Sequence, residues 1–298
     1  PRTLDLSWPP PPRGRGTWNP NQHVPHYMWS VINENPSRWH EGVRFLHHLL
    51  SVNRNRPESL RRVMDALGTA YHTLLRDWAR AAFWWRRSGC GETALLAECY
   101  WQLGSREMAV EALQCIGADT TRNGQVIKLW SDMGDLPRAL AVARQRGGTV
   151  GILAAGDACR LHGRYAEAVA YYDRVLAMRV RTKPERFDQQ RARASREAVL
   201  LFDALDLSRV RPGTYRAQSM GYGAPLYVDV VVQGGRIHSV VVVQHKEKQF
   251  YSSLTETPQR IIAKQGVKGV DATSGATVTS EAIINATAKA LRKRMRGR

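Results

Sequence analysis

The sequence predicts an α+β protein in which an all-α helical-repeat solenoid precedes a small α+β domain. Two observations support this prediction. A helix-pair pattern recurs four times between residues 71 and 168, and beyond residue 207 the hydrophobic period changes from helical to alternating. We therefore expect an extended arm at 1–38, a helical-repeat domain at 39–206 and a C-terminal domain at 207–298.

The first 38 residues are rich in proline and tryptophan, including the run Pro9–Pro12. Prolines disfavour a regular helix, whereas large aromatic side chains usually become buried within their own chain. We expect an extended arm that packs its tryptophans on the body of the protein. The alternative is a segment that binds a partner.

The repeat is carried by a column of alanines spaced 28, 30 and 29 residues apart, namely Ala81, Ala109, Ala139 and Ala168. In three of the four units a glycine stands five positions before the alanine: Gly104, Gly134 and Gly163. This spacing predicts a helix, a glycine turn and a second helix whose alanine permits close approach. The pattern over roughly 64–178 resembles tetratricopeptide and related helix-pair repeats, although its period is shorter. The resemblance implies protein docking or plain scaffolding.

The end of the helical part is highly charged. Residues 179–196 contain many arginines and Pro184, and we expect a helix near 196–205 that joins the domains. The cysteines, which lie without CxxC or CxxCH spacing, are expected to be small core residues. They are Cys90, Cys99, Cys115 and Cys159.

Basic residues outnumber acidic ones, 44 against 26, for a net charge of +18. Such an excess favours acidic partners, anionic membranes or nucleic acid. It is spread along the chain without a nucleic-acid-binding motif, so a solvated basic surface is the preferred interpretation and nucleic-acid binding ranks last. We also find no enzyme nucleophile, metal-ligand cluster or nicotinamide fingerprint, and expect neither catalytic residues nor a metal.

No apolar run is long enough to span a bilayer. Because the chain begins with Pro1 rather than Met, we expect a leader or anchor upstream of this sequence. Membrane association would then come only through a segment absent from this chain.

Three strands and two helices are expected in the C-terminal domain. A strand near 214–219 precedes a hairpin of 226–232 and 237–243, joined by a glycine turn at 233–235. A helix should start at Thr257 and Pro258 and end at Gly266, and a last helix should run from about 280 to 294.

The segment 271–280 is rich in hydroxyl groups and precedes the last helix. Its hydroxyl residues are Thr273, Ser274, Thr277, Thr279 and Ser280. Together with the flexible Gly275 and a helix N-terminus they predict a phosphate site, to which Lys264 and Lys268 would add positive charge. The alternative is a simple cap by Thr279 or Ser280, with Glu281 complementing the helix dipole.

The chain from Tyr215 to Ser280 resembles the FMN-binding domain of the flavin subunits of sodium-pumping NADH:quinone oxidoreductase and the Rnf complex. The likeness rests on 221–223, 228–232, 235–237, His245, Gln265 and above all 270–280, within about 210–293. In that family Asp-x-x-Ser-Gly-Ala-Thr is the recognition site of a flavin transferase, which joins FMN through its phosphate to the threonine hydroxyl.

The resemblance implies a role for each matching residue. Thr277 would accept covalent FMN, and the recognition pattern would be Asp271, Ser274, Gly275 and Ala276. Thr279 and Ser280 would belong to the phosphate end of the site, and His245 and Tyr222 would line the isoalloxazine ring. The sequence departs from the family directly after His245, where Lys246-Glu-Lys-Gln249 replaces a Glu-Thr pair and glycines.

The resemblance further implies a periplasmic or otherwise extracytoplasmic bacterial flavoprotein that carries electrons rather than catalysing a reaction. Its partners would be the flavin transferase and redox proteins docked by the helical repeats. The alternative is an interaction scaffold whose FMN-binding domain is structural or binds flavin reversibly.

Overall fold

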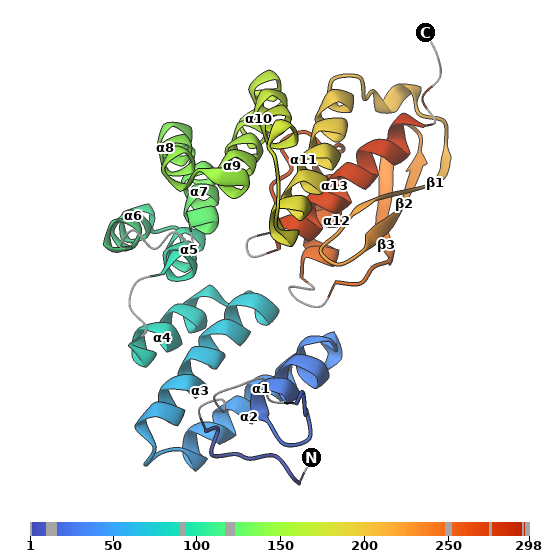
Figure 1. Ribbon diagram of the computed structural model, residues 1–298. Coiled ribbons are helices and arrows are strands. Elements are labelled where there is room, and N and C mark those ends of the chain that lie inside the picture. Colours follow the sequence, from blue (N-terminus) through green and yellow to red (C-terminus); the bar gives the residue numbers. More distant parts are fainter. Residues whose placement is uncertain are drawn as a thin grey trace. The chain divides into compact units, whose positions relative to one another are not determined.

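The computed structural model describes residues 2–9, 17–89, 93–116, 123–247, 252–273, 276–293 and 295 (Figure 1). The chain divides into two compact units. The first comprises Pro1–Gly117 and Lys248–Tyr251, and the second comprises Ala118–Glu247 and Ser252–Arg298.

The described part of the first unit is helical. Its elements are α1 (Val24–Tyr27), the π-helix η1 (Met28–Asn33), the 3-10 helix η2 (Pro36–Arg38), α2 (Trp39–Val52), α3 (Pro57–Ala70), the π-helix η3 (Tyr71–Leu75), α4 (Trp78–Ser88), α5 (Ala94–Gln102) and α6 (Arg106–Cys115).

The N-terminal segment is only partly extended, because short helices occupy most of 24–38, where an extended arm was expected. The Trp8 carbonyl accepts hydrogen bonds from Ser59 Oγ at 3.3 Å and Arg62 Nη1 at 3.0 Å, so this segment is fastened to α3 through its backbone. Trp18 remains 57% exposed and stacks on His26 with ring centroids 4.1 Å apart. The expectation that the tryptophans pack on the body is therefore wrong for Trp18.

The second unit combines helices with a three-stranded sheet. Its elements are α7 (Asn123–Asp132), α8 (Leu136–Arg146), α9 (Gly148–Leu161), α10 (Tyr165–Ala177), α11 (Lys183–Phe202), the 3-10 helix η5 (Leu207–Arg209), β1 (Gly213–Met220), β2 (Pro225–Gln233), β3 (Arg236–Gln244), α12 (Ser253–Lys264) and α13 (Thr277–Arg292). The strands are antiparallel in the order β1-β2-β3. Helix α13 packs against β1, β2 and α11, and α12 packs against β3 and α13 (Figure 1).

The alanine column is confirmed by burial and backbone geometry. All four alanines are 0% exposed, and the three turn glycines have left-handed φ angles of +85°, +83° and +73°. The first of the four repeats has no glycine five positions before its alanine, yet Arg76, which stands there, adopts the same left-handed conformation at φ +55°. The turn geometry is thus kept even where a side chain makes it less favourable.

The hairpin core also follows the predicted alternation. Leu226, Val228, Val230 and Val232 on β2 are all 0% exposed, which places them on the face that α13 covers. Gly234 and Gly235 both have positive φ, as a tight two-residue hairpin turn requires.

Helix α11 starts 13 residues before the expected 196, at Lys183. A capping box between Thr182 and Glu185 begins it, and Pro184 falls in the first turn, where its missing N–H costs no helical hydrogen bond.

Helices α12 and α13 also start earlier than expected. Helix α12 begins at Ser253 with Pro258 inside it, since the turn before a proline can still be helical. It ends with Gln265, not Gly266, in the left-handed region at φ +50°. The Gln265 amide holds this conformation by bonding both backbone groups of Ile237, at 2.9 and 3.0 Å. Helix α13 begins at Thr277.

The cysteines only partly follow the prediction. Cys99 and Cys159 are buried, whereas Cys115 is exposed, so the core assignment is wrong for Cys115. Cys90 lies outside the described residues. Within the described ranges, no helix is both long and apolar enough to cross a membrane.

Candidate functional site

Thr277 is the first residue of α13 and is half-buried. The capping position before it is taken by Ala276, which makes no side-chain cap hydrogen bond, while its carbonyl accepts from Ser280 N at 3.0 Å. The capping role considered for Thr279 or Ser280 is therefore wrong. The N-terminus of this helix remains without a side-chain cap.

The hydroxyls of Thr279 and Ser280 brace the loop from within. Ser280 Oγ accepts hydrogen bonds from Thr273 N at 2.9 Å and from Thr257 Oγ1 at 3.0 Å. The Thr279 hydroxyl donates to the carboxylate of Glu247, and both side chains are buried. These two hydroxyls are thus occupied by the protein itself.

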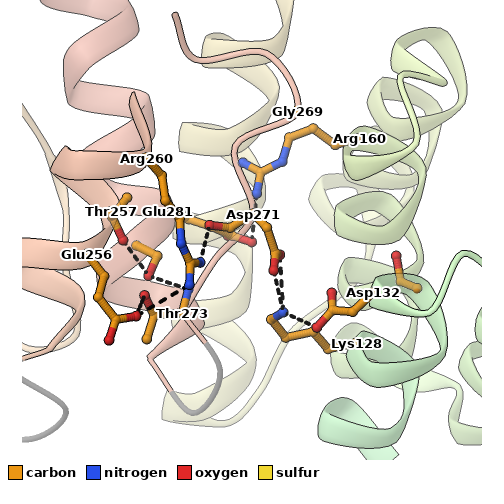
Figure 2. A network of polar contacts seen from close by, with 12 residues as sticks. Lys128, Asp132, Arg160, Glu256, Thr257, Arg260, Gly269, Asp271, Thr273 and Glu281 are labelled. Atoms are coloured by element: carbon orange, nitrogen blue, oxygen red, sulfur yellow. Dashed lines mark hydrogen bonds and ion pairs between the residues drawn. The ribbon is translucent and has the colours of Figure 1, made fainter. Parts of the chain in front are cut away.

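Helix α12 fixes the same loop from the other side (Figure 2). Arg260 Nη1 donates to the Asp271 carbonyl at 3.1 Å, and Thr273 Oγ1 donates to Glu256 at 3.3 Å. Ser274 and Gly275, which complete the expected motif, lie outside the described residues. The described part of the loop therefore has its backbone held immediately before these two residues.

A lysine from α7 reaches the first residue of the motif. Lys128 Nζ lies 3.1 Å from both carboxylate oxygens of Asp271, and 2.5 Å from Asp132 on its own helix (Figure 2). One cation thus bridges two carboxylates and offsets part of their charge.

A buried charge cluster lies next to the start of α13. Glu281 accepts from Arg160 Nη2 on α9 and from Arg191 Nη2 on α11, each at 3.2 Å. Burial disfavours the Glu281 carboxylate, but the two guanidiniums outweigh that cost and hold its pKa below the usual value. Glu281 is the fifth residue of α13 and pairs with these two arginines. The first turn of the helix contains no acidic side chain, so the expected role of Glu281 in complementing the helix dipole there is wrong.

Asp157 on α9 extends this cluster. It accepts from Tyr172 Oη at 2.8 Å and lies 3.4 Å from Arg191 Nη2. Burial, and secondarily the nearby charge of Glu281, raises the pKa of Asp157 from 3.8 to about 7. This carboxyl therefore changes its charge near neutral pH.

Thr277 and these charged groups line one cavity of about 160 Å³, which we call the Thr277 cavity. Asp271, Ala272 and Glu281 line it together with Thr277, and most of the other lining residues come from α7, α9 and α11. These helices contribute Lys128, Arg160 and Arg191 among apolar side chains such as Ile127 and Leu161.

The cations expected from the sequence are engaged elsewhere. Lys264 Nζ donates to the carbonyl of Gly269, and Lys268 pairs with Asp203 at 2.7 Å. Neither is among the residues that line the Thr277 cavity. The expectation that they charge the phosphate site is therefore corrected: the cations at Thr277 come from α7, α9 and α11.

The two candidate ring contacts lie away from this cavity. His245 follows β3 and accepts from Glu247 N at 3.2 Å through Nδ1. Tyr222 is 68% exposed and meets Phe187 edge-on at 6.0 Å between centroids. Neither lines the Thr277 cavity, and their assignment to the isoalloxazine ring stays a prediction.

Two kinds of residue were missed from the sequence. Glu247, 4% exposed, also accepts from Tyr222 N at 2.9 Å and so links three segments of the domain. In the sequence, the only indication that this residue has a special role was the departure from the family pattern at 246–249. Lys128, Arg160 and Arg191 gave no signal, because they lie far from the motif in the sequence.

Comparison with known proteins identifies the C-terminal part. Residues 221–292 match the model of a family described as the FMN-binding domain. This chain carries an FMN-binding domain. The matched range includes β2, β3, α12 and all of α13 with Thr277, whereas α7–α11 lie outside it.

An uncharacterized protein of Treponema pallidum (strain Nichols) is 36% identical over 87 residues, which cover 29% of this chain and 24% of the relative. The similarity thus spans about a quarter of that relative's length. No solved structure matches the chain.

The residues around Thr277 fit the phosphate end of FMN. A hydroxyl at a helix N-terminus whose capping residue makes no side-chain hydrogen bond offers both an attachment atom and backbone N–H groups for an anion. The buried Arg160 Nη1 has no hydrogen-bond partner among the described residues, so the cavity wall contains a donor that an oxygen ligand would satisfy.

Proposed function

We propose that this protein is an extracytoplasmic flavoprotein electron carrier, with FMN linked to Thr277 by a phosphoester bond. The observation that carries the proposal is the position of Thr277, which begins α13 and lines a cavity within the unit that contains the FMN-binding domain. FMN held there supplies one- or two-electron transfer, while the protein sets its position and electrostatic surroundings.

Attachment is a group transfer to the threonine hydroxyl. A flavin transferase would use an activated donor, a flavin dinucleotide, whose bridging P–O bond breaks as the bond between Thr277 Oγ and the FMN phosphorus forms. The nucleoside monophosphate leaves and the hydroxyl proton passes to a base of the transferase. In this chain Ala276 leaves room beside the hydroxyl, and the hydrogen bonds of Ser280 and Arg260 hold the preceding loop.

The helical repeats are proposed to dock the redox partners of the flavin. Stacked helix pairs present long surfaces suited to protein binding, and the net charge of +18 favours acidic partners. An extracytoplasmic location is proposed on the basis of the family resemblance, and fractionation of cells expressing the full-length gene product tests it.

Covalent attachment is tested by expressing the chain with an upstream export signal and a flavin transferase. Wild type should gain the mass of one FMN less one water and keep its yellow colour under denaturing conditions. Thr277→Val should gain neither, and Thr277→Ser, which retains the hydroxyl, should regain both. Thr279→Val serves as the matched control, since its hydroxyl contacts Glu247, and should be modified like wild type.

Two results would contradict parts of this proposal. A wild-type protein that is colourless and has no added mass would contradict covalent attachment of the flavin. Flavin that is bound but released on denaturation would favour the alternative of a scaffold with reversible flavin binding. Electron carriage is checked by reductive titration of the attached flavin. If dithionite does not reduce the attached flavin, or if a soluble acceptor does not reoxidise it, the proposed carrier role is contradicted.

A further inference from the structure

Within the part of the FMN-binding domain that the structure describes, no lysine or arginine lines the Thr277 cavity. Among the described lining residues, every lysine and arginine comes from α7, α9 or α11, outside the 221–292 match. Arg260, Lys264 and Lys268, which lie within the match, are engaged with Asp271 O, Gly269 O and Asp203. A phosphodiester on Thr277 would be an anion, and the cationic side chains of the described lining that could pair with it come from outside the domain.

Arg160 is the residue of the cavity wall best suited to that task. Its side chain is 7% exposed, and its Nη2 is already used by Glu281 at 3.2 Å. Nη1 is buried and has no hydrogen-bond partner among the described residues. A guanidinium presents several donors in a fixed plane, so one amino group can hold Glu281 while the other donates to a phosphate oxygen.

Lys128 acts on the same anion indirectly. Asp271 and Asp132 are both within hydrogen-bond distance of its Nζ, which compensates their charge at the cavity wall. Without that lysine two carboxylates would face an incoming phosphate. Lys128 therefore lowers the repulsion that the motif's own aspartate would exert.

With Asp157 protonated, the described lining of the cavity has no net charge, so a phosphodiester would meet no net repulsion from it at moderately acid pH. The described lining has three cations, Lys128, Arg160 and Arg191, and four carboxylates. Asp157 is one of the four, and burial raises its pKa to about 7, so below neutral pH it contributes little negative charge. The groups facing it are Tyr172, Arg160, Arg191 and Glu281.

We propose that α7 and α9 complete the phosphate end of the flavin site: Arg160 donates to the phosphodiester on Thr277, and Lys128 compensates the carboxylates beside it. This rests on the proposed function, because it requires a flavin phosphate at Thr277. It assigns to the helical repeats a part in holding the cofactor, in addition to docking partners.

The first test compares the ³¹P resonance of the attached flavin in full-length flavinylated variants. Arg160→Gln and Lys128→Gln should each shift this resonance. The matched controls Arg196→Gln, which pairs with Asp173 on the surface, and Lys268→Gln, which pairs with Asp203, should leave it at the wild-type position.

Because Arg160 also pairs with the buried Glu281, a second measurement leaves it intact. Arginine side-chain ¹⁵N spectra of flavinylated wild type and unmodified Thr277→Val should differ at the Arg160 guanidinium and coincide at Arg196. An unmodified wild type by intact mass overturns the proposed function and this inference together. A modified wild type whose arginine spectrum matches that of Thr277→Val, with an unshifted phosphorus signal in Lys128→Gln, overturns this inference alone.

Discussion

Lys128 and Asp271, 143 residues apart in the sequence, form an ion pair in which Nζ lies 3.1 Å from each carboxylate oxygen. The pair joins α7 to the loop that precedes Thr277. The Lys128 side chain is 16% exposed and that of Asp271 is 38% exposed, so the pair is only partly screened by water.

Removing the two partners of this pair should have unequal effects. Asp271→Asn should lower the opening free energy of α13 by about 0.5–1 kcal/mol, as for a partly exposed ion pair. Lys128→Met should cost about 3 kcal/mol, because it also leaves the 8% exposed Asp132 without its cation. Hydrogen exchange of the α13 amides measures both. Equal losses, or a change in the surface control Asp203→Asn, would contradict this account.

Glu281 should be more important for stability than a surface carboxylate. Its side chain is 4% exposed and meets two guanidiniums at 3.2 Å. Glu281→Gln removes the carboxylate that both buried guanidiniums contact and leaves them Asp157, 3.4 Å from Arg191, so it should destabilise the second unit by about 3 kcal/mol. The comparison is Glu197→Gln, whose carboxylate is 49% exposed beside Lys289 and should cost less than about 1 kcal/mol. Equal losses of stability in the two variants would contradict the prediction that the buried charge cluster stabilises the second unit.

Asp157 should make the second unit less stable as pH rises towards neutrality. Its pKa is raised from 3.8 to about 7 by burial, so between these values the folded state retains a proton that the unfolded state has released. The contribution of Asp157 to stability is fully present below pH 3.8 and is lost as pH rises through about 7.

Hydrogen exchange of α9 across pH 4.5 to 7.5, corrected for intrinsic exchange, tests this slope in wild type and Asp157→Asn. The variant should lose the decline that wild type shows. Glu281, whose pKa is lowered, acts with the opposite sign: its contribution is present above its unfolded pKa and is lost in more acidic solution. Parallel profiles for wild type and Asp157→Asn would refute the prediction.

Gly156 is required for the packing of α9 on α10. A Cβ atom there would lie 2.7 Å from Cε1 of Tyr172, a ring that is 0% exposed and whose hydroxyl donates to Asp157. Gly156→Ala should therefore destabilise the second unit by about 1–3 kcal/mol through overpacking. Gly124→Ala on α7, where no atom lies within 4 Å, is the control and should change stability by less than about 0.5 kcal/mol. Unchanged exchange of α10 in Gly156→Ala would show that the ring can move aside.

Local patterns in the sequence were sufficient for the repeats and the hairpin. The buried alanines and left-handed glycines follow from the need of paired helices to approach closely and turn sharply, which is a local requirement. The alternation on β2 likewise follows from the period of a strand. Helix boundaries were less certain, as at Pro258, because packing can continue a helix through a residue that usually begins one.

By itself the sequence determined the element types, the FMN-binding domain and the candidate attachment residue Thr277, because each depends on residues close together in the chain. Only the tertiary structure decided which side chains surround Thr277. It replaced the nearby Lys264 and Lys268 with Lys128, Arg160 and Arg191 from separate helices. Charges interact according to distance in space, and residues on different helices that share a cavity leave no common spacing in the sequence from which their proximity could be read.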